Sequence, residues 1–278
     1  MDESVQNLMG NVRPLSAKEF ELIRELARES FGLELRKGKE QMIGARLNKV
    51  IRGLRLKSFE EYHRYVTSDR SGRALMTMID ALATNFTSFF REPAHFELLR
   101  RHVLPQAKGK SRVRMWSAGC STGEEPYSLA ICTAETAPGT RVEIIATDIS
   151  GRALSKAAAG VYPAERLESM PPALLQRYFD REPEKGGYRI KPAIRGQVRF
   201  QRLNLIEQFT SLGKFDLIAC RNVMIYFDKA LQQNVVSRFA SQLEPGGYLL
   251  IGHSETLNGM RHGLQYIAPA VYRNAGSR

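Results

Sequence analysis

A glycine-containing segment carries the residues of this sequence best suited to binding a nucleotide-like cofactor. Gly119 and Gly123 stand between an expected strand and an expected helix, where glycines permit a tight turn and the close approach of a ligand. Asp148 follows at the end of the next expected strand, and in Rossmann-type sites an acid so placed accepts hydrogen bonds from ribose hydroxyls. The segment therefore predicts a cofactor that contains a ribose, although an ordinary glycine-rich strand–helix turn has the same outline.

Two glutamates after the glycines help to choose among such cofactors. Glu124 and Glu125 occupy the expected first turn of the helix, where a dinucleotide places its pyrophosphate. Two carboxylates would repel a pyrophosphate, whereas they suit the cationic amine of a methionyl group. The pair therefore favours S-adenosylmethionine over a nicotinamide dinucleotide. The alternative is that both glutamates interact only with the helix dipole.

Polar residues also follow an apolar strand expected at residues 215–220. Arg221, Asn222 and Tyr226 come after its C-terminal end, and ligands of open α/β sheets bind at that end. We therefore expect these three side chains near the ligand. A loop with a packed tyrosine is the simpler alternative.

A third polar group precedes the expected sheet. Asn85, Thr87 and Arg91 lie among aromatic residues, where a helical region meets the region of strands and helices. A buried arginine normally has a partner. The segment could reach the cofactor site, or Arg91 could pair across the junction between two domains.

The elements that position these residues divide the chain into two regions. Residues 15–82 are predicted to be helical, because Ser16 and Glu19 form a capping box and the apolar residues of 38–54 share one helix face. After residue 112, strands alternate with helices, which is typical of a mostly parallel α/β sheet. The expected strands are residues 113–116, 142–147, 196–203, 215–220 and 247–252, and the expected helices are 124–136, 151–159 and 229–243.

This pattern predicts a Rossmann-like α/β fold preceded by a small helical domain. We expect a basic helical domain over residues 1–83 and a connection over 84–110 that contributes to the active site. A Rossmann-like domain would then cover residues 111–278. A polar stretch flanked by short β-type pieces predicts a small β-subdomain near 184–200.

Positive charge is concentrated in one expected helix. The chain has a formal net charge of +12, and residues 36–57 contain eight basic residues and one acidic residue. Such a field attracts nucleic acid, an anionic membrane face or an acidic protein. A solvated basic helix face is the alternative.

The composition also narrows the class of protein. No run of about 18 apolar residues is present, so we expect no membrane insertion. Three cysteines are too few and odd in number for a disulfide framework or a zinc site. We therefore expect a cytoplasmic protein without a bound metal, and a monomer, because no exposed apolar seam is evident.

Five segments together resemble the CheR-type chemotaxis receptor methyltransferases, and the resemblance extends over nearly the full chain. It implies transfer of a methyl group from S-adenosylmethionine to glutamate side chains on the cytoplasmic helices of transmembrane chemoreceptors. The products would be glutamate methyl esters and S-adenosylhomocysteine. The segments are residues 85–92, 121–128, 146–149, 220–228 and 252–255.

The resemblance also implies roles for individual residues. Arg91 and Tyr226 would lie nearest the transferred methyl group. Four cations of the basic helix would contact the receptor, namely Arg46, Lys49, Arg52 and Arg55. The positions implied to bind the cofactor are Asn85, Thr87, Arg91, Glu125, Asp148, Asn204, Leu205, Arg221 and Asn222.

The chemistry of this reaction requires no general base. A glutamate carboxylate is already ionised at neutral pH, because its ordinary pKa is about 4.3. Arg91 would keep it ionised in a poorly hydrated site, and Tyr226 would orient it.

Two other functions are weighed against this one. A nucleic-acid methyltransferase would suit the net charge, but residues 221–224 lack the Asn/Asp-Pro-Pro-aromatic turn of enzymes that methylate base amino groups. We therefore expect no nucleic-acid partner. The third possibility is a domain that binds S-adenosylmethionine as a sensor without catalysis.

Overall fold

The computed structural model of the chain describes residues 14–107, 110, 112–182 and 186–276. These residues form two compact units, the first ending at Thr84 and the second beginning at Asn85. Residues 1–13 of the expected helical domain lie outside the described part. Each unit has its own buried residues.

The first unit is helical throughout its described residues, as the sequence predicted. Ser16 caps the first helix in a capping box with Glu19, and Gly32 ends it in the left-handed conformation, with φ 69°. In the second helix, Ile43, Leu47 and Ile51 are buried. The helices are α2 (Ala17–Phe31), α3 (Glu40–Gly53), α4 (Phe59–Ser68) and α5 (Arg73–Leu82).

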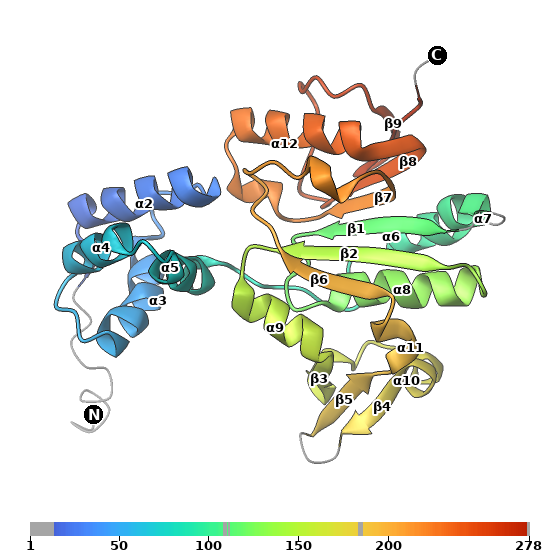
Figure 1. The fold of residues 1–278 in the computed structure, drawn as a ribbon, viewed down its shortest axis with the longest axis horizontal. Coiled ribbons are helices and arrows are strands. Elements are labelled where there is room, and N and C mark those ends of the chain that lie inside the picture. Colours follow the sequence, from blue (N-terminus) through green and yellow to red (C-terminus); the bar gives the residue numbers. More distant parts are fainter. Residues whose placement is uncertain (1–13, 108–109, 111, 183–185, 277–278) are drawn as a thin grey trace. The chain divides into compact units, whose positions relative to one another are not determined.

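The second unit is built on a seven-stranded sheet (Figure 1). Its strand order is β6-β2-β1-β7-β8-β10-β9, with the first five strands parallel to one another and β10 antiparallel to both its neighbours. The strands are β1 (Val113–Ala118), β2 (Val142–Asp148), β6 (Val198–Arg202), β7 (Phe215–Cys220), β8 (Leu243–Ile251), β9 (Gln265–Ala268) and β10 (Val271–Arg273).

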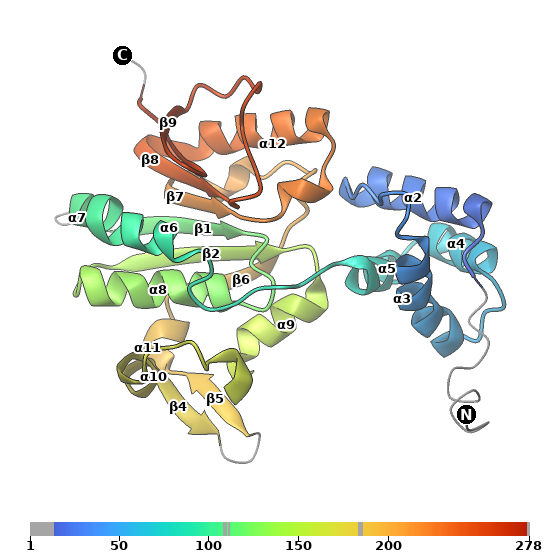
Figure 2. The same ribbon diagram turned by 180° about the vertical axis from the view of Figure 1, so that it is seen from behind.

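Helices cover both faces of this sheet, as Figures 1 and 2 show. Met115 and Leu217 belong to one core with the helices that follow Asn85 and with α8, whereas Trp116 and Ile218 belong to a second core with α12. Neighbouring residues of a strand thus supply opposite cores, as the period of two requires. The helices are α6 (Pro93–Leu98), α7 (Leu104–Ala107), α8 (Glu124–Thr136), α9 (Gly151–Ala159) and α12 (Lys229–Gln242).

The small β-subdomain differs from the one expected near residues 184–200. Its three antiparallel strands are β3 (Val161–Pro163), β5 (Gly187–Ile190) and β4 (Phe179–Glu182), accompanied by the short helices α10 (Pro172–Tyr178) and α11 (Pro192–Arg195). Val198–Arg202 is instead an edge strand of the main sheet, because Val198 and Phe200 pack against its core while Arg199 is exposed. Residues 184 and 185 lie outside the described part.

The expected connection over residues 84–110 is also different in the structure. From Asn85 onward the chain belongs to the second unit, and it forms α6, a π-helical turn over Leu99–Val103, and α7. Phe96 and Leu104 are buried in the core against the sheet. The segment is therefore part of the second unit, and its apolar residues recur at a helical spacing.

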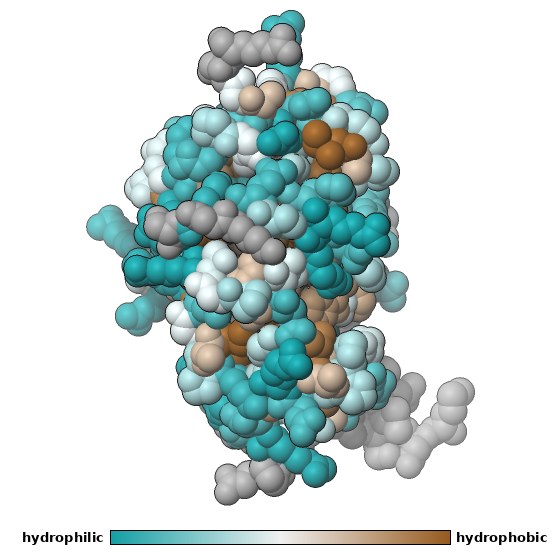
Figure 3. All heavy atoms as spheres, turned by 90° about the vertical axis from the view of Figure 1, so that its right-hand side faces the viewer, coloured by the Kyte–Doolittle hydropathy of each residue, from teal (hydrophilic) through white to brown (hydrophobic). Residues whose placement is uncertain are grey.

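The surface is predominantly polar where Figure 3 shows it, with small and separate hydrophobic areas. No helix among the described residues is both long and apolar enough to cross a membrane. Two of the large exposed hydrophobic residues are neighbours on β9, and the others lie at separate places in the chain. The residues are Met42, Leu54, Tyr65, Phe86, Tyr266 and Ile267.

Candidate active site

The candidate site lies at the topological switch point of the sheet. β1 and β7 are parallel neighbours there, and the chain leaves them toward opposite edges. Gly119 and Gly123 both have positive φ, 85° and 97°, in the turn that follows β1. A Cβ on Gly119 would overlap Val223 in the loop after β7. The two loops are therefore in close contact, and the predicted glycine-rich turn is confirmed.

Asp148 is fixed at the end of β2 by backbone donors. The Ser121 N–H donates to its Oδ2 and the Ser150 N–H to its Oδ1, both at 2.8 Å. The Leu203 N–H donates to the Asp148 carbonyl, which brings the following Asn204 and Leu205 to the same edge of the sheet. Three of the predicted cofactor positions thus lie around one strand end.

Arg221 connects three of the segments that the sequence singled out. Its Nη1 donates to Glu125 Oε2 at 3.0 Å, and its Nη2 donates to Glu92 Oε2 at 3.0 Å and also to the Arg91 carbonyl. The Ser117 hydroxyl donates to the other oxygen of Glu125 at 2.7 Å. One buried guanidinium therefore joins the loop after β7, the first turn of α8 and the segment before α6.

The charges of this network leave an excess of negative charge. Burial would raise the pKa of Glu92, but Arg221 and the His253 N–H together hold that pKa below its usual value. Burial raises the pKa of Glu125, and Arg221 and Ser117 oppose the shift. When both carboxylates are ionised, two negative charges face one positive charge, which suits a cationic ligand.

Glu124 takes a different place from its neighbour. It accepts a hydrogen bond from the Thr122 hydroxyl at 2.6 Å and lies 3.9 Å from Arg166, with its side chain almost completely buried. Only Glu125 joins the Arg221 network. The prediction that both glutamates face the amine of a ligand therefore remains for Glu125 and not for Glu124.

Asn222 is held by the loop after β8. Its backbone has φ 58°, and its N–H donates to Glu255 Oε2 at 3.0 Å. Glu255 also accepts from the N–H groups of Gly252, at 2.5 Å, and Ile225, at 3.2 Å. A side chain on Gly252 would overlap Asn222. This carboxylate clamp sets the path of the chain just before Tyr226.

Two buried polar atoms in the loops after β1 and β7 lack a hydrogen-bond partner among the described residues. They are Ser121 Oγ, in the glycine-rich turn, and Asn222 Oδ1. Buried polar atoms are normally satisfied, so such a pair indicates a polar ligand or water. Together with the close backbone turn, these atoms fit an amino-acid-bearing nucleoside.

The structure shows less about the remaining predicted residues. Arg91 donates to the Phe86 carbonyl at 3.0 Å, within its own segment. Thr87 is buried, and Tyr226 ends the 3₁₀ turn Met224–Tyr226. Among the described residues, no side-chain hydrogen bond joins Arg91 to Tyr226 or involves Asn85.

Two residues of the site were missed when roles were assigned from sequence. Glu92 and Glu255 lie inside the quoted motifs, yet each acquires its role only by contacting a distant loop. The sequence did place Glu92 directly after Arg91, and Glu255 directly after Gly252-His253-Ser254. These positions could have marked both acids as candidates for the site.

The basic residues of α3 fall into two groups. Arg46 donates to the Leu82 carbonyl at 2.7 Å and lies 3.3 Å from the Thr84 hydroxyl, so it caps the end of α5. Lys49, Arg52 and Arg55 are exposed, and within the described residues none of them forms an ion pair.

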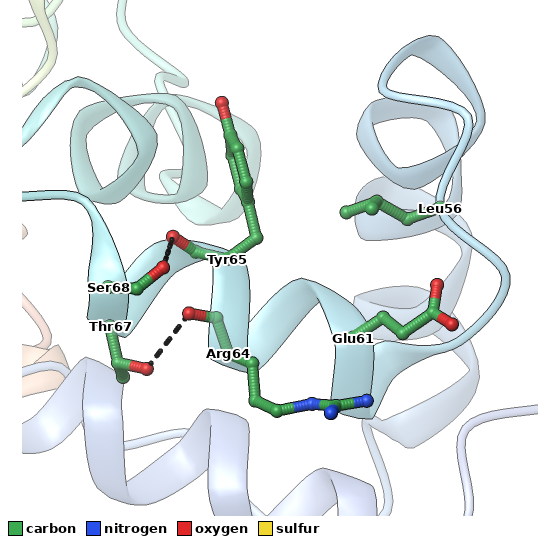
Figure 4. Close-up of a pocket in the computed structure, with 6 residues that line it drawn as sticks. All are labelled: Leu56, Glu61, Arg64, Tyr65, Thr67 and Ser68. Atoms are coloured by element: carbon green, nitrogen blue, oxygen red, sulfur yellow. Dashed lines mark hydrogen bonds between the residues drawn. The ribbon is translucent and has the colours of Figure 1, made fainter.

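A shallow hollow in the helical unit is separate from these features. Figure 4 shows its lining, in which the Thr67 and Ser68 hydroxyls donate to carbonyls of their own helix, those of Arg64 and Tyr65. The hollow therefore offers no organised set of polar groups. It is completed by Leu56 and Glu61.

The fold and the site together define the class of protein. Numbered along the chain, the strands of the main sheet follow the order 3-2-1-4-5-7-6, with the last strand inserted antiparallel. The glycine-rich turn and the acid at the end of the second strand stand at its switch point. This arrangement is that of the Rossmann-like S-adenosylmethionine-dependent methyltransferases.

The chain belongs to the CheR methyltransferase family. The family model of the CheR methyltransferase SAM-binding domain matches residues 85–272, and that of the CheR methyltransferase all-alpha domain matches residues 18–83. The resemblance found in the sequence is confirmed, and S-adenosylmethionine is the cofactor of this domain.

Curated relatives match the chain over almost its full length. It is 38% identical over 270 residues to a chemotaxis protein methyltransferase of Borreliella burgdorferi, covering 93% of this chain and 95% of the relative. It is 41% identical over 252 residues to chemotaxis protein methyltransferase 1 of Pseudomonas aeruginosa, covering 87% and 91%. The chemotaxis protein methyltransferase of Escherichia coli is 39% identical over 264 residues, covering 93% and 91%.

Proposed function

We propose that this enzyme methylates glutamate side chains on the cytoplasmic helices of transmembrane chemoreceptors, in the cytoplasm. The observation that carries the proposal is the match to curated chemotaxis protein methyltransferases over nearly the whole of both chains. The products are a glutamate methyl ester and S-adenosylhomocysteine.

The cofactor is assigned to the residues around the switch point. The hydrogen bonds that bring together Arg91, Glu125 and Arg221 support this assignment, as do those that fix Asp148 beside Ser121. When bound, S-adenosylmethionine supplies an electrophilic methyl group on a sulfonium. The complete set is Asn85, Thr87, Arg91, Glu125, Asp148, Asn204, Leu205, Arg221 and Asn222.

The transfer is a displacement at the methyl carbon. A carboxylate oxygen of the substrate forms the new O–C bond as the S–C bond breaks, and that electron pair stays on sulfur. No proton moves, so the protein needs to supply in-line positioning rather than a base. Arg91 holds the substrate carboxylate in its ionised form, and the Tyr226 hydroxyl orients it.

The exposed cations of α3 provide the contact for the receptor. Lys49, Arg52 and Arg55 would attract an acidic helical surface and help to set its register. Arg46 contributes to this face less directly, because it caps α5. The enzyme acts as a monomer and has no nucleic-acid partner, which is consistent with the scattered exposed apolar residues and with the relatives' names.

The test is methyl transfer from methyl-labelled S-adenosylmethionine to membranes that contain chemoreceptors. We expect label on the receptor and its release as methanol in mild alkali, because carboxyl methyl esters hydrolyse there. Label that stays on protein in alkali, or label on nucleic acid, would contradict glutamate methylation. Cofactor binding without transfer to any acceptor would instead support a sensor.

The roles of Arg91 and Tyr226 are tested separately. Tyr226→Phe and Arg91→Ala should reduce kcat strongly while changing the affinity for S-adenosylhomocysteine less, since both act on the substrate carboxylate. Equal losses of kcat and affinity would place the two residues in cofactor binding alone. Lys229→Ala serves as the control, because Lys229 is exposed and begins α12, just after the loop that contains Tyr226.

A further inference from the structure

We propose that Glu92 is a positioning residue of the methyltransferase site, which acts by orienting Arg221 toward the cofactor. The inference rests on the assignment of Arg221 to the cofactor site in the proposed function. Glu92 is not among the cofactor-binding or catalytic residues proposed above.

The contacts of Glu92 are those of an anchor. Its Oε2 accepts hydrogen bonds from Arg221 Nε, at 3.3 Å, and Nη2, at 3.0 Å, and its Oε1 accepts from the His253 N–H at 3.2 Å. The exposed fractions of the Glu92 and Arg221 side chains are 13% and 3%. A charged hydrogen bond between buried groups is much stronger than one on the surface, so this contact can hold the long Arg221 side chain in one orientation.

Glu92 balances the attraction of Glu125 for Arg221. The three nitrogens of the guanidinium group are divided between Glu92, Glu125 and the Arg91 carbonyl. Glu125 approaches from α8 on one side, and Glu92 and the carbonyl approach from the segment before α6 on the other. Without the charge of Glu92, the neutral Arg91 carbonyl would be left to oppose the attraction of Glu125.

The backbone around Glu92 is held in an unusual conformation. Phe90 and Glu92 have φ of 50° and 57°, a region that side chains other than glycine rarely adopt. Phe90 is secured by a hydrogen bond from its N–H to Ser128 Oγ, at 2.9 Å, and by the edge of the Phe96 ring. Strain of this kind persists where the surrounding contacts determine it, and it is concentrated at functional sites.

Two histidines lie beside Glu92. His95 Nδ1 lies 3.4 Å from Glu92 Oε2, and the ring of His253 packs edge-on against that of His95. Burial and Arg221 lower the pKa of His95 to about 4, so its ring is neutral at pH 7. Glu92, His95 and His253 are close enough together to surround a metal ion. However, Glu92 Oε2, the oxygen nearest both histidines, is already paired with Arg221.

The experiment measures the affinity of the full chain for S-adenosylhomocysteine and for S-adenosylmethionine by calorimetry. Glu92→Gln keeps the shape of the side chain and removes its charge. We expect both affinities to fall by about tenfold, the factor that corresponds to one lost charged hydrogen bond. Glu92→Asp should lose less affinity than Glu92→Gln, because it restores the charge.

Glu97→Gln is the matched control. Glu97 lies in α6, the helix that Glu92 precedes, but it is half-exposed and pairs with Arg100 and Arg101 on the surface. The control should leave both affinities and the melting temperature unchanged. A fall in affinity for Glu92→Gln with an unchanged melting temperature separates positioning from general destabilisation.

A double-mutant cycle with Arg221→Lys identifies the route of the effect. If Glu92 acts through Arg221, the double variant should bind hardly more weakly than Arg221→Lys alone. Additive losses would overturn the inference, as would a loss for S-adenosylmethionine without one for S-adenosylhomocysteine, which indicates direct action on the sulfonium charge. If Arg221→Lys itself leaves affinity unchanged, the assignment of Arg221 fails instead.

Discussion

At the scale of single residues, Gly119 shows most directly how the site depends on backbone geometry. Its φ of 85° and its proximity to Val223 exclude a side chain. Gly119→Ala should therefore destabilise the fold by about 2–4 kcal/mol and abolish measurable cofactor binding. Gly151→Ala, at a helical glycine with open space around it, should be nearly neutral. Urea unfolding and calorimetry of both variants check this prediction.

His95 is the residue whose titration should govern acid stability. Burial, followed by the charge of Arg221, lowers its pKa from 6.5 to about 4. A lowered pKa means that the folded state prefers the neutral ring, so stability is present above about pH 6.5 and is lost as pH falls toward 4. The loss between pH 7.5 and pH 5 should be roughly 2 kcal/mol.

The measurement compares the wild-type chain with His95→Phe by chemical unfolding at several pH values. The variant should lose less stability over this pH range. Glu124, Glu125 and Glu255 have raised pKa values and act in the opposite direction, but they do so in both proteins. Parallel pH curves for the two proteins would show that His95 is not the responsible group.

At the scale of elements, the sequence was most informative where a helix or strand has strong local signals. The helices α8 and α9 have the predicted bounds, and β7 does too, because glycine, serine and apolar runs mark their ends. The β-subdomain was placed wrongly because its strands are only three or four residues long, and β3 pairs with β5 across the intervening helix α10. The antiparallel strands β9 and β10 are just as short, with four and three residues, and were missed for that reason.

The site divides in a similar way. Arg221, Glu125 and Asp148 could be predicted, because each follows a strand end or a glycine turn at the switch point. The roles of Glu92 and Glu255 could not, since each depends on a contact between loops that are distant in sequence.

The loop after β7 should depend on the Glu255 clamp. Its carboxylate accepts three backbone N–H groups, from Gly252, Asn222 and Ile225. Glu255→Ala leaves these buried donors unsatisfied, so it should destabilise the fold by about 2–4 kcal/mol and lower kcat by displacing Tyr226. Unfolding and steady-state kinetics test this, and wild-type kcat in a destabilised variant would show that the clamp does not position Tyr226.

At the scale of the whole molecule, methyl transfer and recognition of the receptor are expected to depend on different units. Reversal of the charges at Lys49, Arg52 and Arg55 should raise the KM for receptor about tenfold at low salt. The affinity for S-adenosylhomocysteine should not change, because the residues proposed to bind the cofactor all belong to the second unit.

Reversal of Lys18, Arg70 and Arg73 is the matched control, because these exposed cations belong to the same unit but lie outside α3. It should leave the KM for receptor much closer to the wild-type value. Equal effects of the two triple variants would mean that net charge, rather than the face of α3, attracts the receptor.

Tandem mass spectrometry of a methylated receptor identifies the atom that receives the methyl group. We predict methyl groups on glutamate side chains of the cytoplasmic helices, which disappear after mild alkali. They should also be absent when Tyr226→Phe replaces the wild-type enzyme. Methyl groups on lysine, arginine or other nitrogen atoms, stable to alkali, would contradict glutamate methylation.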